Sequence, residues 1–126
     1  MPSGEPFTND QYRDIERVIE VANAETGLRY SVFVGEVEGD IRDAAEAKHA
    51  AFGAAAAETV LVVVSPGDRL LEIVTGESAA RRLSDRACAL AALSMTTSFT
   101  GGDLAGGIVT GVRMLAEAAG RPVPSY

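Results

Sequence analysis

The sequence predicts a single α/β domain: a three-layer α/β/α sandwich with a small mixed β-sheet of three or four strands flanked by helices. The stretch from Val60 to Gly76, VLVVVSPGDRLLEIVTG, encodes two apolar strands joined by a Pro66-Gly67 turn. Around it lie more helical segments than one face of such a sheet can hold, which favours helices on both faces. At 126 residues, the chain is long enough for one core without disulfides or a structural metal.

The first helix is expected over residues 9–26, where apolar side chains recur at helical spacing. These side chains are Tyr12, Ile15, Ile19 and Ala22. Thr8 or Asn9 can cap the start of this helix, and Gly27 can end it. Residues 28–34, LRYSVFV, alternate with period two and are rich in aromatic and β-branched side chains, so they predict the first strand.

A second helix is expected from Ile41 to about Phe52, with Asp40 as its cap and Gly53 just after it. The next strand, Val60 to Val64, is apolar without alternation, which is typical of a central strand covered on both faces. Because a helix connects this strand to the first, the two strands should be parallel.

The third strand is expected over residues 70–75 and should run antiparallel to the second, since only a tight turn separates them. A short helix around residues 78–83, a very apolar helix over 85–99 and a last helix over 104–119 complete the domain. Gly107 and Gly111 lie one turn apart on the last helix. We expect them to let its backbone approach a neighbour closely, which would offset the roughly 1 kcal/mol that glycine costs inside a helix.

The domain is expected to span residues 9–120, with a flexible N-terminal arm over residues 1–8 and a C-terminal tail over 121–126. The first twelve residues lack the basic and apolar segments of a signal or transit peptide. We find no run near the ~20 apolar residues that a membrane span needs. The single cysteine, Cys88, lies in an apolar run and predicts a core residue in a reducing compartment, the cytoplasm.

The net charge of the chain limits the classes of molecule that it is expected to bind. The chain has 11 basic and 18 acidic residues and a formal charge of -7, which opposes binding to nucleic acid or anionic lipid. The glycines of the last helix match neither GxGxxG after a strand nor Gly-Lys-Ser/Thr, so both nucleotide motifs are absent. An unidentified protein partner is therefore expected.

Acidic side chains should gather at one rim of the sheet, beyond the ends of the two parallel strands. The antiparallel strand and the helix after it bring the chain back to that rim. The residues expected there are Glu36, Glu38, Asp40, Asp68 and Asp103. Oxygen ligands of this kind suit Ca²⁺ or Mg²⁺, so Asp40, Asp68 and Asp103 are the candidate metal ligands. In the alternative interpretation the aspartates are helix caps and a turn residue, and the glutamates are solvated.

The opposite rim is expected to carry three arginines beside a helix start. Its polar and glycine residues are Thr75, Gly76, Arg81, Arg82, Ser84, Asp85 and Arg86. The arginines could hold a phosphate or carboxylate, or they could simply pair with Glu77 and Asp85 on the surface. The only histidine, His49, could be a general base, but a structural or exposed role is favoured because the sequence fixes no nucleophile beside it.

The order of helix, SVFVG, helix, VLVVVSP, turn, LLEIVTG, LSDRA and SFTGGDLAGGIVTGV resembles the TPM domain, also described as thylakoid acid-phosphatase-like. It is more similar still to an actinobacterial single-domain group of unknown function. The similarity covers about Ile15 to Ala119. The positions that match the family are Thr75, Gly76, Asp85, Gly102 and Asp103.

The resemblance implies a mixed sheet between helices, and it links the chain to acid phosphatase activity, divalent cation binding, photosystem repair and receptor assembly. This chain departs from phosphatase patterns: it has no DxD, no Arg-His-Gly and no CX5R, because Ser94 stands where Cys88 would need an arginine. The leading interpretation is a soluble interaction or accessory module that could bind a divalent cation. The alternative is a weak metal-assisted phosphomonoesterase that uses Asp103, so whether the protein is an enzyme stays open.

Overall fold

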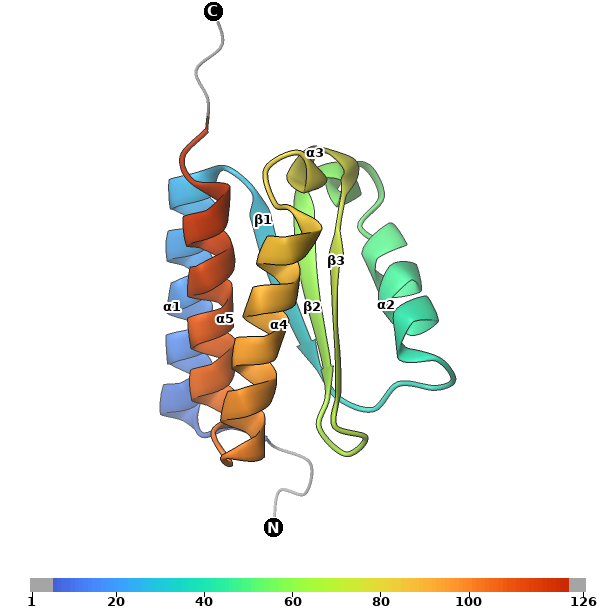
Figure 1. Ribbon diagram of the computed structural model, residues 1–126, viewed down its shortest axis with the longest axis vertical. Helices are drawn as coiled ribbons and strands as arrows, with labels where there is room; N and C mark the ends of the chain where they lie inside the picture. Colours follow the sequence, from blue (N-terminus) through green and yellow to red (C-terminus); the bar gives the residue numbers. More distant parts are fainter. Residues whose placement is uncertain (1–5, 123–126) are drawn as a thin grey trace, which may run out of the picture.

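The computed structural model describes residues 6–122, and it has the predicted α/β sandwich architecture (Figure 1). The described elements are α1 (Asn9–Thr26), β1 (Arg29–Val34), α2 (Ile41–Ala50), the 3₁₀ helix η1 (Gly53–Glu58), β2 (Thr59–Ser65), β3 (Leu70–Thr75), α3 (Glu77–Ala80), α4 (Asp85–Thr100) and α5 (Leu104–Ala119). In the described part of the chain, no helix is both long and apolar enough to cross a membrane.

The sheet has the order β1-β2-β3. β1 pairs with β2 in parallel, with Val32 opposite Val62, and β2 pairs with β3 in antiparallel, with Val62 opposite Ile73. Both strand directions are confirmed. Within residues 6–122 the sheet has three strands. The sequence predicts three or four.

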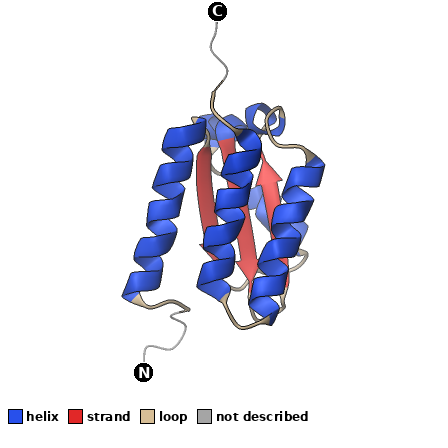
Figure 2. Ribbon diagram, turned by 60° about the vertical axis from the view of Figure 1, so that its left-hand side comes forward, coloured by secondary structure: helices blue, strands red, loops and turns tan. Residues whose placement is uncertain are grey.

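The central strand β2 divides the core into two layers. All seven of its residues are buried, and because side chains alternate across a strand, Val60, Val62 and Val64 pack on one side while Leu61 and Val63 pack on the other. The first set meets α1, α4 and α5, the second set meets α2, and Figure 2 shows the three helices side by side over one face. The absence of alternation in this strand is therefore explained by two apolar faces.

The folded domain begins before residue 9, although the sequence predicts a flexible arm over residues 1–8. Phe7 is buried in the main core and packs edge-to-face on Tyr12, with ring centroids 5.2 Å apart. Thr8 caps α1 through a capping box with Gln11. Residues 7 and 8 therefore belong to the folded domain, whereas residues 1–5 of the predicted arm and 123–126 of the predicted tail lie outside the described residues.

Two predicted helices differ in extent from the observed ones. The second helix ends at Ala50 rather than near Phe52, and the alanine-rich stretch after it forms η1 instead of a plain connection. Gly53 has a φ of 62°, a left-handed conformation that an α-helix does not continue through. The short helix covers Glu77–Ala80 instead of residues 78–83.

Close packing of α4 on α5 depends on two glycines, as predicted. A Cβ at Gly107 would lie 2.8 Å from both Phe99 and Ser98, and one at Gly111 would lie 2.5 Å from the Met95 side chain. Met95 is itself fully buried. The missing side chains thus allow the two helices to approach each other, which compensates for the low helix propensity of glycine.

Candidate functional site

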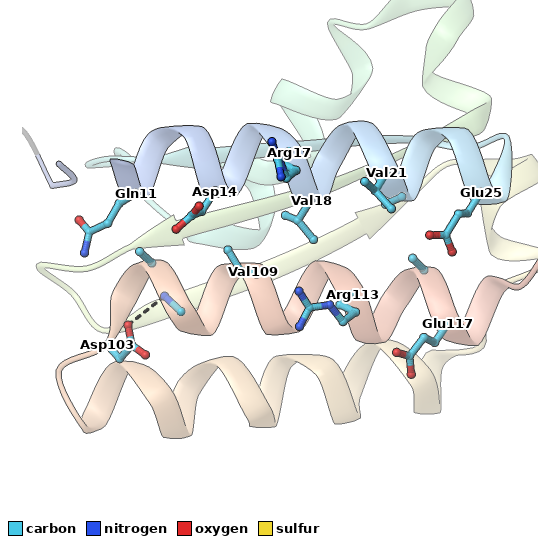
Figure 3. A pocket seen from close by; sticks show the side chains of 14 residues that line it. Gln11, Asp14, Arg17, Val18, Val21, Glu25, Asp103, Val109, Arg113 and Glu117 are labelled. Atoms are coloured by element: carbon cyan, nitrogen blue, oxygen red, sulfur yellow. Dashed lines mark hydrogen bonds between the residues drawn. The ribbon is translucent and has the colours of Figure 1, made fainter. Parts of the chain in front are cut away.

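A surface groove lies between α1 and α5, two helices that run in the same direction (Figures 1 and 3). We call it the α1–α5 groove; its volume is about 690 Å³. It is lined by Gln11, Asp14, Arg17, Val18, Val21, Ala22 and Glu25 of α1 and by Asp103, Ala105, Gly106, Val109, Arg113, Ala116 and Glu117 of α5 and its cap.

The floor of the groove is apolar. Val18 and Ala22 are buried, and Val109 faces them from α5 (Figure 3). Val21 stands on the wall with 48% of its surface exposed, which is high for a valine beside a packed interface. Small residues of α5, Ala105, Gly106 and Ala116, keep the groove open between the two helices.

Charged side chains follow the groove in an acid–base–acid order (Figure 3). Asp14 and Asp103 lie at the end where both helices begin, Arg17 and Arg113 lie in the middle, and Glu25 and Glu117 lie at the far end. None of these six side chains forms an ion pair with another residue among 6–122. Their charges are therefore available to a molecule that lies in the groove.

The structure brings Asp103 into this groove, not into a metal cluster. Asp103 is the N-cap of α5, where its carboxylate accepts a hydrogen bond of 2.9 Å from the Gly106 amide. A Cβ at Gly106 would lie 2.1 Å from that carboxylate, so Gly106 leaves room for the cap. Gly102, just before it, has a φ of 89°, which favours glycine.

The other two candidate metal ligands also have local hydrogen bonds. Asp40 caps α2 through the Asp43 amide at 3.0 Å, and Asp68 accepts from the Ser65 hydroxyl at 3.0 Å. Within the described chain, no three His, Cys, Asp or Glu side chains form a group that could hold a metal ion. The aspartates thus have the capping and turn roles of the alternative interpretation, and a Ca²⁺ or Mg²⁺ site at this rim stays a prediction.

At the opposite rim, two of the three arginines, Arg81 and Arg82, have partners within the described chain. Arg82 donates to the carbonyl oxygens of Thr26 at 2.5 Å and Gly120 at 2.6 Å, and so it ties the C-terminal ends of α1 and α5 together, where the helix dipole favours a cation. Arg81 pairs with Glu77 at 3.3 Å on the surface, as the surface alternative predicts. Asp85 is exposed in the first turn of α4, next to its cap Ser84.

The family-like Thr75-Gly76 pair has a packing role. Thr75 ends β3 opposite Val60, and the Gly76 amide donates to the Thr59 carbonyl at 3.0 Å. A Cβ at Gly76 would lie only 1.8 Å from the carbonyl oxygen of Ala56 in η1. This pair lies at the end of the sheet opposite Gly102 and Asp103 (Figure 1), so the five family-like residues do not form one site.

His49 and Cys88 have structural surroundings. The Nε2 atom of His49 lies 3.0 Å from the Thr59 carbonyl oxygen, so it donates there and joins α2 to the start of β2. Burial, with a smaller effect from Asp85, raises the pKa of the Cys88 thiol. A raised pKa leaves less of the reactive thiolate at neutral pH. Cys88 is half-buried and packs against the main core rather than within it.

Tyr30 is nearly fully buried, and its hydroxyl has no hydrogen-bond partner among the described residues. Burial raises its pKa, against the opposing effects of Thr26 and Arg82. In the unfolded chain the Cys88 thiol and the Tyr30 phenol ionise near 9.0 and 10.0, so above these values the unfolded state binds fewer protons than the folded state. The folded state is thus favoured while both groups stay protonated. This contribution to the free energy of unfolding is complete below pH 9.0 and is lost as pH rises through the higher folded-state pKa values.

We therefore expect the melting temperature to fall from neutral to strongly alkaline pH, and to fall less steeply in the double variant Tyr30→Phe/Cys88→Ala. The exposed Leu93, whose side chain does not ionise, supplies the control, since Leu93→Ala should keep the wild-type slope. An unchanged slope in the double variant would contradict this account. Scanning calorimetry across the pH series is the measurement.

Sequence reasoning identified Asp103 but missed the groove in which it lies. α1 and α5 are far apart in the chain, and their adjacency follows only from the folded arrangement. One signal was present: Asp14 and Arg17 lie off the apolar stripe of α1, on a part of the helix surface that borders α5.

Fold and groove together define a small mixed-sheet α/β sandwich domain with an amphipathic groove between two parallel helices. The chain belongs to the family described as a domain of unknown function (DUF5130), whose model matches residues 1–116. Among curated proteins, none matches the chain.

Solved structures with the same fold come from several bacteria. The BA42 protein of the psychrophilic Bizionia argentinensis has a TM-score of 0.82 at 21% identity, over 94% of this chain and 86% of that one. The N-terminal domain of the cg2496 protein from Corynebacterium glutamicum has a TM-score of 0.77 at 16% identity, over 99% and 81% of the two chains. An N-terminal domain from P. gingivalis has a TM-score of 0.78 at 15% identity, over 92% and 78%. At these identities the likeness concerns the fold alone.

Proposed function

We propose that this domain is an interaction module that binds an amphipathic helix of another protein in the α1–α5 groove. The observation that carries the proposal is the combination of an apolar floor with six charged side chains that have no ion-pair partner within the described chain. Helices that dock in grooves use this combination, with apolar anchors for affinity and charged positions for orientation.

The order of charges specifies the partner. Asp14 and Glu25 are separated along α1 by about 16 Å, at about 1.5 Å per residue. A complementary helix of three to four turns would carry a basic residue near each end, to meet the acidic pairs, and an acidic residue midway, to meet Arg17 and Arg113. Its apolar side would lie against Val18, Val21 and Val109.

Selection of helical peptides displayed on phage against the folded domain tests the proposal. Enriched peptides should share the base–acid–base order, and amide NMR shifts on titration should map to α1 and α5. The double variant Arg17→Glu with Arg113→Glu reverses both central charges. It should lower the affinity for a selected peptide by roughly tenfold or more, because the central acidic residue of the peptide would then face two acidic residues.

The matched control reverses two arginines outside the groove, Arg13→Glu with Arg86→Glu, for the same change in net charge. This control should bind as the wild type does. Equal weakening in both variants would mean that only net charge matters, and selected peptides that map away from α1 and α5 would refute the groove as the binding site.

The relation to the TPM family suggested by the sequence supports an accessory role of this kind, since the resemblance links that family to receptor assembly. The cation-binding and phosphomonoesterase alternatives are kept as proposals of lower rank. Both alternatives need a bound metal ion, and no three His, Cys, Asp or Glu side chains among residues 6–122 form a group that could hold one.

A further inference from the structure

A second hollow lies at the rim of the sheet, between the β2–β3 turn and the α4–α5 corner. We call it the rim pocket; its volume is about 350 Å³, inside the range of about 300–1,000 Å³ that is usual for small-molecule sites. It is lined by Val64, Ser65, Pro66, Arg69, Leu70, Leu71, Thr96, Phe99, Thr100, Gly102 and Leu104.

Most of the lining of the rim pocket is apolar. Val64 is fully buried beneath it, and Leu71, Phe99 and Leu104 are partly buried members of the main core. Leu70 at the mouth has 45% of its surface exposed. An apolar chain placed here would cover surface that is otherwise in contact with water.

Of the described residues that line the rim pocket, Arg69 alone is charged. Its guanidinium has no ion-pair partner within residues 6–122, although the chain as a whole has a net charge of -7. The Thr96 hydroxyl, which also lines the pocket, donates to no other described residue. With respect to residues 6–122, the mouth therefore offers an unpaired cation and an unused hydroxyl donor beside an apolar floor.

The backbone at Arg69 is unusual. Its φ is 56°, in the left-handed region that glycine occupies readily and that side chains with a Cβ disfavour. The Arg69 amide closes the turn by donating to the Pro66 carbonyl at 3.1 Å. An arginine at this position of a hairpin turn costs stability relative to glycine, and backbone strain of this kind is found most often at functional sites.

We propose that the rim pocket binds a small carboxylate with an apolar chain, of the medium-chain fatty acid class. The carboxylate pairs with Arg69 and accepts from Thr96, while the chain lies over Leu71, Phe99 and Leu104. A guanidinium matches a carboxylate through two parallel hydrogen bonds, and the apolar floor excludes ligands that are polar throughout. This site is separate from the α1–α5 groove and does not depend on the proposed helix binding.

Titration of the folded protein with octanoate, followed by amide NMR, tests the proposal. Shifts should concentrate on the rim-pocket residues and saturate. Octanol lacks the carboxylate and acetate lacks the chain, so each should bind at least roughly tenfold more weakly than octanoate. Octanol binding as tightly as octanoate, or no saturable octanoate binding at millimolar concentration, would overturn the proposal.

Arg69→Gly removes the cation without harming the turn, since glycine adopts a positive φ freely. We expect this variant to melt no lower than the wild type and to lose roughly tenfold or more in octanoate affinity. Arg69→Lys should keep part of the affinity, because it keeps the charge but loses the paired geometry. Unchanged octanoate affinity in Arg69→Gly would refute the role of Arg69.

A blocking pair of variants tests the location. Thr96 lines the rim pocket and Thr97 does not, although both are exposed on α4. Thr96→Trp should fill the mouth and abolish octanoate binding, whereas Thr97→Trp should bind as the wild type does. Equal behaviour of the two variants would place octanoate elsewhere and overturn the assignment.

Discussion

Replacing Gly76 by alanine should destabilise the domain by about 4 kcal/mol or more, an effect at the upper end for a single methyl group. The new Cβ would lie 1.8 Å from the Ala56 carbonyl oxygen and 2.5 Å from that of Ala57. Both are backbone atoms, so no side-chain rotation can relieve the overlap. The φ of Gly76 is -70°, which alanine adopts easily, and the penalty is therefore steric rather than conformational.

Urea unfolding followed by circular dichroism measures this effect. Gly67→Ala is the matched control, because a Cβ at Gly67 meets nothing within 4 Å, and it should change the free energy of unfolding little. A Gly76→Ala variant as stable as the control would mean that η1 moves away from β3 at little cost, contrary to the packing described above.

The second large effect is expected at Gly111. Valine there would place its Cβ 2.5 Å from the Cγ and Sδ atoms of Met95. Met95 is fully buried, and protein interiors are packed too closely to accept a displaced side chain without strain. We expect Gly111→Val to cost about 3 kcal/mol, since overpacking of the α4–α5 contact outweighs the better helix propensity of valine.

Thr110→Val is the control for the second prediction. Thr110 is the neighbour of Gly111 on α5, it is exposed, and valine has nearly the shape of threonine and a similar helix propensity. Melting temperatures should fall steeply for Gly111→Val and hardly at all for Thr110→Val. A rescue of Gly111→Val by Met95→Ala would identify the Met95 side chain as the group that the valine displaces.

Much of the fold was predictable because each element carries a local signal. The turn at Pro66-Gly67 and the uninterrupted apolar run of β2 fix the order and direction of the central strands. The caps at Asp40 and Asp103 fix where α2 and α5 begin. These signals act over a few residues, so they can be interpreted without knowledge of the rest of the chain.

The candidate site was less predictable because it depends on contacts between distant segments. Arg17 and Arg113 line the same groove only because α1 packs on α5, and no local pattern encodes that adjacency. Arg82 is a second example of a role that depends on distant segments. From the sequence it was a candidate anion ligand, but in the structure its guanidinium donates to the carbonyl oxygens of Thr26 and Gly120.

The Arg82 contacts also determine how the α1–α5 groove can move. α1 and α5 cannot part at their C-terminal ends without breaking hydrogen bonds to a charged donor, whereas no corresponding bridge between the described residues joins their N-terminal ends. We therefore expect any widening of the groove to begin at its other end, beside Asp14 and Asp103. In the proposed complex, the end of the groove beside Glu25 and Glu117 would then be the less adaptable one, and it should tolerate only small residues of the docking helix.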